Sequence, residues 1–333
     1  MAVAAVTYRC NSRCRMCNIW KMDTDKSAEL KPAEYAKLPV GLEEINLTGG
    51  EPFLRDDLVE ILDVIASRCR RAKIVMPTNG FLTEKIVSSA KKIIKRDYLN
   101  RLHIAVSLDG LGYAHEEIRG IPEAFAKAAT TIDGLKRLGF PAANLGFGYT
   151  FMKGNEDELA GVAELAGKLG VNYGVSLAHN SDNYFSTHTN HGLDAGEIKR
   201  QAAGLIRKKI SSFKKNELGK CYYLHGLVEF AENGKRLVPC DALRGSFFMD
   251  PSGNIFPCNI VNQSVGNLKE NSFAEIWDGE KAAAARRAAA ACQTPCWMVC
   301  TAKYPIKKHW LKAGWWILRE KIKKIVYENT PDQ

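Results

Sequence analysis

The sequence has no apolar run approaching the ~18–20 residues that a membrane-crossing helix needs. Its N-terminus, MAVAAVTYRC, lacks a basic region ahead of the short apolar stretch, so we expect a β-strand there and not a signal peptide. The composition also excludes a disordered chain, which would have low hydrophobicity, because 46% of the residues are hydrophobic and 25% are charged. A chain of 333 residues is long enough for one large domain of roughly 200–250 residues and a smaller one.

Positive charge is concentrated in the second half of the chain. The formal net charge is +10, from 47 Lys and Arg residues against 37 Asp and Glu residues. Residues 199–244 contain 11 basic and 4 acidic residues, and residues 303–333 contain 8 and 3. Such a surface attracts nucleic acid, anionic lipid or an acidic substrate, although a solvated helix face has the same composition. We expect no nucleic-acid partner, because the sequence contains no recognition module.

Strand and helix patterns alternate through the first two-thirds of the chain. Apolar or β-branched runs of strand length occur at residues 3–8, 44–47, 73–76, 102–107, 144–151 and 173–177. Stretches with helical spacing of apolar residues lie between them, for example at residues 58–65 and 159–169. Six successive β-α units predict a parallel sheet covered by helices, with functional residues just after the C-terminal ends of the strands.

The pattern changes after about residue 218. Residues 247–256 (FFMDPSGNIF) predict a β-hairpin, and residues 273–290 predict a helix. Residues 307–327 predict a basic helix with Trp at 310, 315 and 316 and one apolar face, formed by residues 311, 315, 318, 322 and 325. That face either packs on the rest of the protein or lies on an anionic membrane surface.

Ten cysteines are present, and eight of them form two groups at opposite ends of the chain. Without a secretory signal we expect a reducing, cytoplasmic location, in which clustered cysteines bind metal or do redox chemistry. Cys10, Cys14 and Cys17 form a C-x3-C-x2-C motif directly after the first predicted strand. Three soft thiolates suit an iron–sulfur cluster or zinc, and the lack of a nearby fourth ligand indicates an open coordination position. A zinc site completed by a distant residue and plain buried thiols are the alternatives.

Further motifs stand at the ends of the next predicted strands. Residues 49–52 (GGEP) follow the second strand, residues 78–80 (TNG) the third and residues 107–110 (SLDG) the fourth, with residues 118–120 (IRG) beyond. Over roughly residues 1–215 this order of motifs resembles the radical S-adenosylmethionine (SAM) enzymes, whose signature is C-x3-C-x2-C after the first strand of a (β/α)6 chain. The resemblance implies an α/β fold, with a partial (β/α)6 TIM-like barrel over residues 1–218.

The resemblance also implies the cofactors. Cys10, Cys14 and Cys17 would bind three irons of a [4Fe–4S] cluster, whose fourth iron holds the amino and carboxylate groups of SAM. One electron, from a flavodoxin- or ferredoxin-type donor, would cleave SAM to methionine and a 5′-deoxyadenosyl radical that abstracts hydrogen from the substrate.

The same resemblance assigns the residues around SAM. Gly49 and Gly50 lack a Cβ and would let the backbone approach its methionyl end. Arg119 would pair with its carboxylate, with a surface salt bridge as the alternative. Met16 stands where the family usually has an aromatic residue that borders the adenine. The full set of expected SAM-binding residues is Met16, Gly49, Gly50, Glu51, Pro52, Asn79, Ser107, Asp109 and Arg119.

The second cysteine group resembles the SPASM or shortened twitch extension of radical SAM enzymes, which binds auxiliary [4Fe–4S] clusters. We expect this Cys-rich extension, a β-hairpin plus helices, over residues 219–305, and an amphipathic helix over residues 306–333. Two fully ligated clusters need eight ligands, so the resemblance implies one auxiliary cluster, and a zinc ribbon is the alternative. The candidate ligands are Cys240, Cys258, Cys292, Cys296 and Cys300.

Four of these five cysteines would suffice as ligands of one auxiliary cluster. Cys240 and Cys258 fit the family's pattern best, Cys296 and Cys300 come next, and Cys292 is spare or replaces one of them. The family usually closes with C-x2-C, whereas this chain has C-x3-C-x3-C. Of the two remaining cysteines, Cys69 is expected to be inert, and Cys221 either faces the substrate or is buried.

These motifs indicate a reaction class and leave three functions open. The first is hydrogen abstraction from a peptide or protein side chain, with the auxiliary cluster accepting an electron. The second is the same chemistry on a small molecule, such as a sugar, a cofactor precursor or a lipid-linked substrate. The third is a non-enzymatic metal-binding scaffold. The basic second half fits an acidic peptide, a phosphorylated sugar or an anionic lipid equally well, and the enzyme would be cytoplasmic or peripheral at the membrane.

Overall fold

One sheet organises the molecule, and its first six strands are those expected from the sequence. The computed structural model describes residues 1–292 and 296–328. The strands are β1 (Ala2–Thr7), β2 (Glu44–Gly49), β3 (Lys73–Thr78), β4 (Leu102–Ser107), β5 (Leu145–Phe151) and β6 (Asn172–Leu177). They pair in parallel in sequence order. Within the described residues the sheet stays open, with β6 at one edge, which confirms the expected partial barrel.

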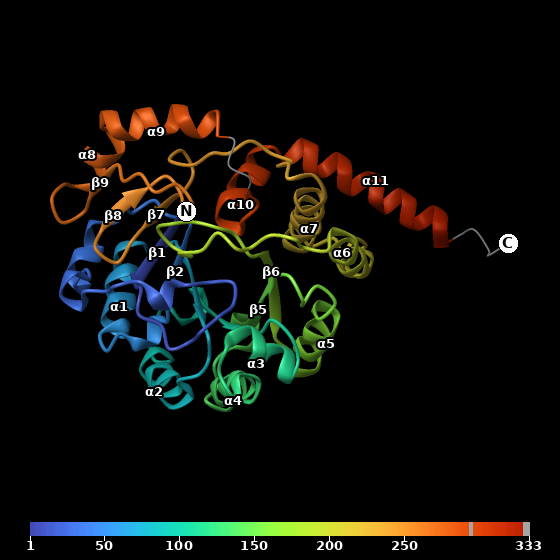
Figure 1. Cartoon of the computed structure of the whole chain (residues 1–333), viewed down its shortest axis with the longest axis horizontal. Coiled ribbons are helices and arrows are strands. Elements are labelled where there is room, and N and C mark those ends of the chain that lie inside the picture. Colours follow the sequence, from blue (N-terminus) through green and yellow to red (C-terminus); the bar gives the residue numbers. More distant parts are fainter. Residues whose placement is uncertain (293–295, 329–333) are drawn as a thin grey trace.

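Helices connect the strands and cover the outside of the sheet (Figure 1). They are α1 (Leu58–Arg68), α2 (Thr83–Ile93), α3 (Tyr113–Arg119), α4 (Ala124–Arg137), α5 (Leu159–Leu169), α6 (Ala195–Lys209) and α7 (Lys215–Asn233). Short 3-10 turns lie at Ile19–Lys21, Lys26–Ala28, Pro32–Lys37, Pro52–Leu54, Leu99–Arg101 and Ala142–Asn144. Local chemistry sets helix ends: the Asp194 side chain accepts the N–H of Glu197 at the start of α6, and Gly170 ends α5 with φ of 67°.

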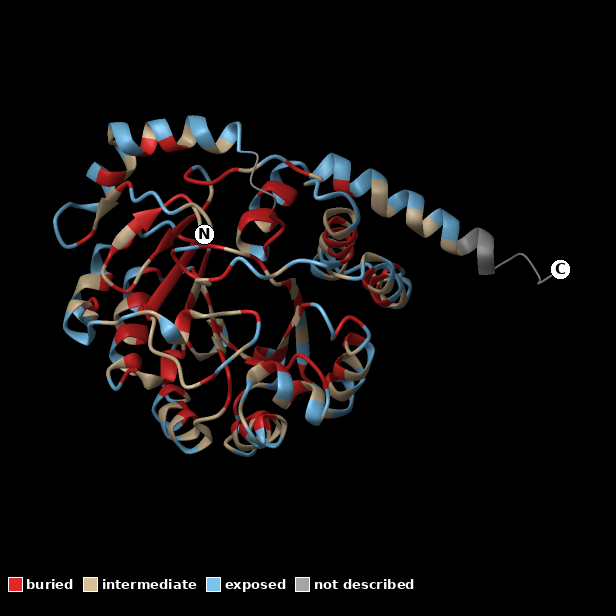
Figure 2. Cartoon of the chain, viewed as in Figure 1, coloured by how far each residue is buried: buried red, intermediate tan, exposed pale blue. Residues whose placement is uncertain are grey.

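The C-terminal hairpin extends the same sheet. Strands β7 (Phe247–Met249) and β8 (Asn254–Phe256) form the predicted hairpin, and β9 (Gly266–Asn267) pairs with β8. β7 lies parallel to β1, with Ala2 opposite Phe247. All six residues of β1 are buried, because β1 is paired on both edges and covered on both faces (Figure 2).

The C-terminal helices differ in their limits from the predicted ones. They are α8 (Phe273–Asp278), α9 (Glu280–Ala290), α10 (Val299–Lys308) and α11 (Trp310–Glu328). The prediction of one helix over residues 273–290 is wrong, because Gly279 is extended (φ −70°, ψ 161°) and separates α8 from α9. The basic helix expected from residue 307 begins at Trp310. Residues 307–308 are the end of α10, and His309 interrupts the helical conformation between α10 and α11.

The domain boundaries that the sequence predicts at residues 218 and 305 stay a proposal. Helix α7 crosses the first and α10 crosses the second, and the sheet runs through both parts. None of the described helices combines the length and apolarity that crossing a membrane requires.

Candidate active site

The first cysteine group lies in the loop that leaves the C-terminal end of β1. The Ser12 hydroxyl donates to the carbonyl of Arg119 at 3.1 Å and lies 3.0 Å from the Cys14 sulfur. The backbone N–H of Ser12 donates to the Cys10 sulfur at 3.5 Å. The loop is anchored further by the N–H of Arg13, which donates to the carbonyl of Arg119. The structure thus brings the three predicted thiols together against the end of α3.

Burial dominates the electrostatics of these thiols. It raises the pKa of Cys10 and of Cys17 to about 12, and the neighbouring thiols add to the rise. The guanidinium of Arg119 acts in the opposite direction on Cys17. Three thiolates this close repel one another unless a cation lies among them, so the loop has the chemistry of a metal donor set.

Arg119 and Asp109 form a buried ion pair beside this loop. Their Nη2 and Oδ2 atoms are 2.5 Å apart, and the Arg119 side chain is only 11% exposed. The pair is therefore not the surface salt bridge that was the alternative for Arg119. Nη1 of Arg119 lies 3.6 Å from the Cys14 sulfur, and its buried Nε has no hydrogen-bond partner among the described residues. A buried donor of this kind is suited to receive a ligand.

Glu51 is fully buried, and protein donors occupy its carboxylate. It accepts hydrogen bonds from the Thr78 hydroxyl at 2.9 Å and from the N–H groups of Asn79 and Phe53 at 2.7 and 3.1 Å. Burial raises its pKa to about 7 although these donors oppose the rise. The Asn79 amide in turn donates to the Asn11 side chain at 2.7 Å, so Glu51 and Asn79 connect the ends of β2 and β3 to the cysteine loop.

The two glycines of residues 49–52 are required by the β1 backbone. A Cβ on Gly49 would lie 2.1 Å from the carbonyl oxygen of Thr7, and one on Gly50 would lie 2.2 Å from that of Arg9. Gly50 and Glu51 donate their N–H groups to these same carbonyls. Pro52 is buried at the start of the 3-10 turn that follows.

Met16 packs against Met152, which lines a small cavity at the ends of β5 and β6. Met16 is buried with Ile118 and Met152, next to Cys14 and Cys17. The cavity has a volume of about 210 Å³, and Arg15, Met152 and His191 are among its lining residues. Ser107 is half-buried at the end of β4. A larger hollow of about 820 Å³ lies at the opposite, N-terminal end of β1, away from the cysteines.

Four of the five C-terminal cysteines come together. Burial raises the pKa of Cys258 to about 11 and that of Cys300 to about 12, and neighbouring thiols of this group add to both. Cys240 and Cys296 are the neighbours of Cys258, and the pKa of Cys296 is raised as well. Cys292 is exposed, whereas the other four are buried or half-buried.

Polar groups surround the four-thiol group. Nη1 of Arg236 lies 3.0 Å from the Cys296 sulfur, and the same guanidinium donates to the carbonyls of Cys296 and Thr301, both at 2.8 Å. The buried hydroxyl of Tyr223 has no hydrogen-bond partner in the described part of the chain, and Cys296 and Cys300 help to raise its pKa. His179, after β6, accepts the N–H of Trp297 at 3.0 Å and so ties this group to the barrel.

Tyr184 lies between the two cysteine groups. Its ring belongs to a buried apolar cluster that includes Phe248 and is bordered by Cys10, Cys17 and Cys300. Its hydroxyl lies 2.8 Å from that of Thr48, at the end of β2. The sequence prediction missed Tyr184, His179 and Arg236. The position of residues 178–193 directly after β6 is the signal that could have indicated the first two.

The other cysteines lie apart from both groups. Cys69 donates to the carbonyl of Pro39, as expected for an inert thiol. Cys221 is buried in α7, and burial raises its pKa to about 11, with Lys209 and Glu217 as charged neighbours.

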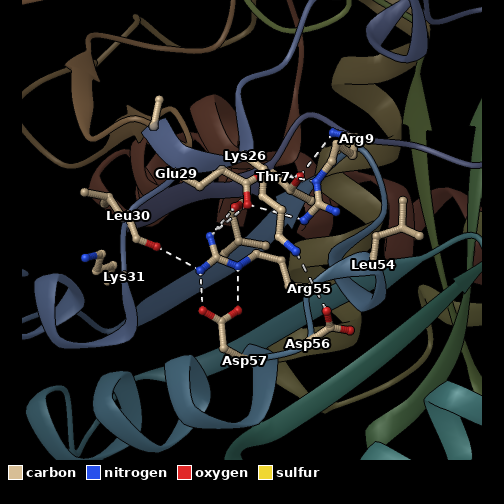
Figure 3. A network of polar contacts seen from close by, with 12 residues as sticks. Thr7, Arg9, Lys26, Glu29, Leu30, Lys31, Leu54, Arg55, Asp56 and Asp57 are labelled. Atoms are coloured by element: carbon tan, nitrogen blue, oxygen red, sulfur yellow. Dashed lines mark hydrogen bonds and ion pairs between the residues drawn. The ribbon is translucent and has the colours of Figure 1, made fainter.

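A buried polar network supports the base of the site (Figure 3). Arg55 donates to both carboxylate oxygens of Asp57 at 2.7 and 2.6 Å, and to the carbonyls of Val6 and Leu30. It also lies 3.3 Å from the carboxylate of Glu29, so it joins β1, the loop after the cysteines and the turn after β2.

The residues present fit iron–sulfur clusters, whose protein ligands are cysteine thiolates. Seven buried or half-buried thiols in two groups, with guanidinium donors beside each, match larger sulfur-ligated groups.

An open parallel α/β barrel with such thiols at the end of its first strand defines a class of metal-cofactor enzymes. Residues 5–166 match the radical SAM superfamily, and residues 240–301 match the SPASM iron-sulfur cluster-binding domain. The chain therefore belongs to the radical SAM superfamily and carries a SPASM-type extension, as its motifs predicted. Its cofactors are SAM, the SAM-binding [4Fe–4S] cluster and an auxiliary iron–sulfur cluster.

Known proteins resemble the chain over most of its length. The pre-heme d1 synthase of Dinoroseobacter shibae is 26% identical over 317 residues, covering 82% of this chain and 72% of its own. The AdoMet-dependent heme synthase of Methanosarcina barkeri is 26% identical over 305 residues, covering 82% and 80%. The PqqA peptide cyclase of Methylocella silvestris is 23% identical over 305 residues, covering 88% and 78%.

Solved structures share the fold. The structure of anSMEcpe with bound AdoMet and the Cp18Cys peptide has a TM-score of 0.64 and 16% identity, and the match covers 91% of this chain and 87% of that one. SuiB of Streptococcus suis, bound to S-adenosylmethionine, has a TM-score of 0.63 and 14% identity, with 86% and 67% covered.

Proposed function

We propose that this enzyme abstracts a hydrogen atom from a peptide or protein side chain. The observation that carries the radical chemistry is the group of Cys10, Cys14 and Cys17 after β1, with the Arg119 guanidinium beside Cys14 and Cys17. When bound, the cofactors supply reductive cleavage of SAM to a 5′-deoxyadenosyl radical, with the auxiliary cluster as electron acceptor. The reducing electron comes from a flavodoxin- or ferredoxin-type donor.

The residues of the site divide into ligands and positioning groups. Cys10, Cys14 and Cys17 bind the first cluster, and Arg119 donates toward it while Asp109 fixes the guanidinium. Glu51 and Asn79 position the cysteine loop and are not free to bind SAM through the atoms already used. Arg119 would also pair with the SAM carboxylate, held in place by Asp109, and the remaining contacts to SAM would come from Met16, Gly49, Gly50, Pro52 and Ser107.

Cys14→Ala tests the radical assignment. The variant loses one of three ligands, so it should hold about four irons fewer and form no 5′-deoxyadenosine from SAM and dithionite after anaerobic reconstitution. Cys69→Ala is the matched control, since Cys69 is a buried thiol outside both groups and should leave turnover intact. If Cys14→Ala still produced 5′-deoxyadenosine, the assignment of the first cluster would be wrong.

The auxiliary cluster has its own test. We assign Cys240, Cys258, Cys296 and Cys300 as its ligands and Cys292 as spare, because the first four are buried or half-buried and Cys292 is exposed. Cys292→Ala should keep about eight irons, whereas Cys258→Ala should fall to about four. Equal iron loss in both variants would mean that Cys292 is a ligand.

The substrate class rests on the relatives. PqqA peptide cyclases and the subtilosin protein AlbA of Bacillus subtilis have names that point to peptides, and the two heme synthases favour a cofactor precursor as the second candidate. An extract of the producing cells, separated into peptides and small molecules, distinguishes them. The peptide fraction should stimulate 5′-deoxyadenosine formation, and prior protease digestion should abolish the effect. Stimulation by the small-molecule fraction alone would favour the second candidate.

A further inference from the structure

Helix α11 has two different apolar faces. One packs on α7: Ala313 is buried, and Trp316 stacks on His225 with ring centroids 4.6 Å apart and meets the ring of Tyr222 at 5.7 Å. The helix then projects beyond the rest of the molecule (Figure 1). These contacts fix its orientation, so the opposite side of α11 points away from α7.

The opposite face is apolar and exposed. Leu311, Trp315, Leu318 and Ile322, which we call the α11 face, are 68%, 72%, 50% and 53% exposed. Their spacing of four, three and four residues places them along one side of the helix. Four of the five positions expected to form a stripe are therefore exposed and not packed on the barrel, and the side chain of Ile325 lies outside the described residues. Figure 2 shows α11 as mostly exposed.

A second exposed aromatic side chain lies beside this helix. Phe213, in the connection between α6 and α7, is 93% exposed. The Lys321 ammonium lies 4.7 Å from its ring centre and donates to the carbonyl of Ser212 at 3.0 Å, and Lys324 donates to the hydroxyl of Ser211 at 2.8 Å. The connection and the C-terminal half of α11 thus form one surface.

Basic side chains border the apolar ones. On α11, Lys312, Arg319 and Lys323 follow the α11 face around the helix and are exposed. Lys214 on the connection and Lys215 at the start of α7 are exposed next to Phe213 in the sequence. Glu320 and Glu217 are half-buried and already paired with Lys323 and Lys209, and the side chain of Glu328 at the end of α11 lies outside the described residues.

We propose that the α11 face and Phe213 bind the surface of an anionic bilayer. A basic helix with Trp and aliphatic side chains on one side binds at the level of the headgroups, where each Lys or Arg near an anionic surface adds to the attraction. Two copies of this surface would bring lysines against lysines, so charge disfavours a dimer of this chain as the occupant. The proposal concerns location and is independent of the proposed reaction.

Vesicle co-sedimentation of the reconstituted full-length enzyme tests this. It should bind vesicles of phosphatidylcholine with phosphatidylglycerol, bind phosphatidylcholine alone weakly, and be released at ~0.5 M salt, where charges are screened within a few ångströms. The double variant Trp315→Ser, Leu318→Ser should bind anionic vesicles at least about tenfold more weakly than the wild type. In the wild type both apolar side chains leave water on binding, and the variant lacks them. Basal 5′-deoxyadenosine formation should be unchanged, which shows that the variant is folded.

Tyr113→Ser is the matched control. Tyr113 is 76% exposed on α3, outside the proposed surface, so its loss should leave vesicle binding intact. Equal binding of wild type and double variant, or no preference for anionic vesicles, would overturn the proposal. So would a wild-type dimer that the double variant converts to a monomer in sedimentation velocity, because the α11 face would then join two copies.

Discussion

His115 is a buried neutral histidine beside the Arg119–Asp109 pair. Its Nδ1 accepts the N–H of Asp109 at 3.0 Å, and its Nε2 has no partner among the described residues. Burial, and secondarily the Arg119 charge, lowers its pKa from 6.5 to about 3. The folded enzyme therefore excludes a proton that the unfolded chain accepts below pH 6.5.

This difference predicts acid sensitivity. Between about pH 6.5 and pH 3 the unfolded chain binds more protons at this position, so stability falls as the pH is lowered through this range. His115→Asn keeps an acceptor near the position of Nδ1 and cannot titrate. The loss of unfolding free energy between pH 7.5 and 5.5 should be about 1 kcal/mol smaller in the variant. The same pH dependence in urea titrations of both proteins would mean that His115 is not held neutral by burial in the folded enzyme.

At the scale of residues, sequence reasoning located the cysteines but not all of their neighbours. C-x3-C-x2-C and GGEP are local patterns, so they could be placed at strand ends before the structure was known. Arg236 approaches Cys296 across about sixty residues of sequence, and Tyr184 meets Thr48 across more than a hundred. Such contacts depend on how strands order in the sheet and on side-chain rotamers, which spacing does not encode. The reason for Gly49 was also hidden, because the crowding comes from Thr7.

At the scale of elements, the Arg55 network holds β1 and the two loops around the site together. Arg55→Met should destabilise the enzyme by about 3–5 kcal/mol, because it leaves the buried Glu29 carboxylate with Arg9 as its one cation among the described residues and removes the guanidinium paired with Asp57. Arg96→Met is the control: its ion pair with Asp63 is partly exposed, at 45% and 35%, and is worth about 0–1 kcal/mol. The denaturant midpoints of the two variants would show this difference. A loss of stability in Arg55→Met as small as that in Arg96→Met would show that the Arg55 network is not needed for stability.

Elements were predictable where apolar periodicity and turn residues agree. The six parallel strands and the hairpin turn at Gly253 (φ 90°) follow this rule. The break between α8 and α9 at Gly279 was not predictable in this way, because the Ala-rich sequence on its C-terminal side favours a continuous helix. A Cβ at this position would lie 2.9 Å from the carbonyl oxygen of Glu275, so the extended turn needs glycine. The pairing of β7 with β1 was also not predictable from local pattern.

At the scale of the whole molecule, that pairing makes the extension part of the barrel sheet. A chain ending at residue 239 would leave the edge of β1 unpaired and apolar, and we expect it to aggregate. Light scattering at equal concentration checks this against a full-length control in which Cys240, Cys258, Cys296 and Cys300 are replaced by alanine. The control keeps β7 and should scatter less. If both aggregated equally, the missing cluster and not the missing strand would be responsible.

The position of β1 also affects how the protein is made. β1 is synthesised about 240 residues before β7, its second neighbour in the sheet. At ~5–20 residues per second, the edge of β1 stays without this partner for roughly 10 to 50 s of translation. Through that interval a largely apolar strand is open to wrong pairing, so we expect this enzyme's yield to depend on chaperone supply and elongation rate more than its final stability suggests.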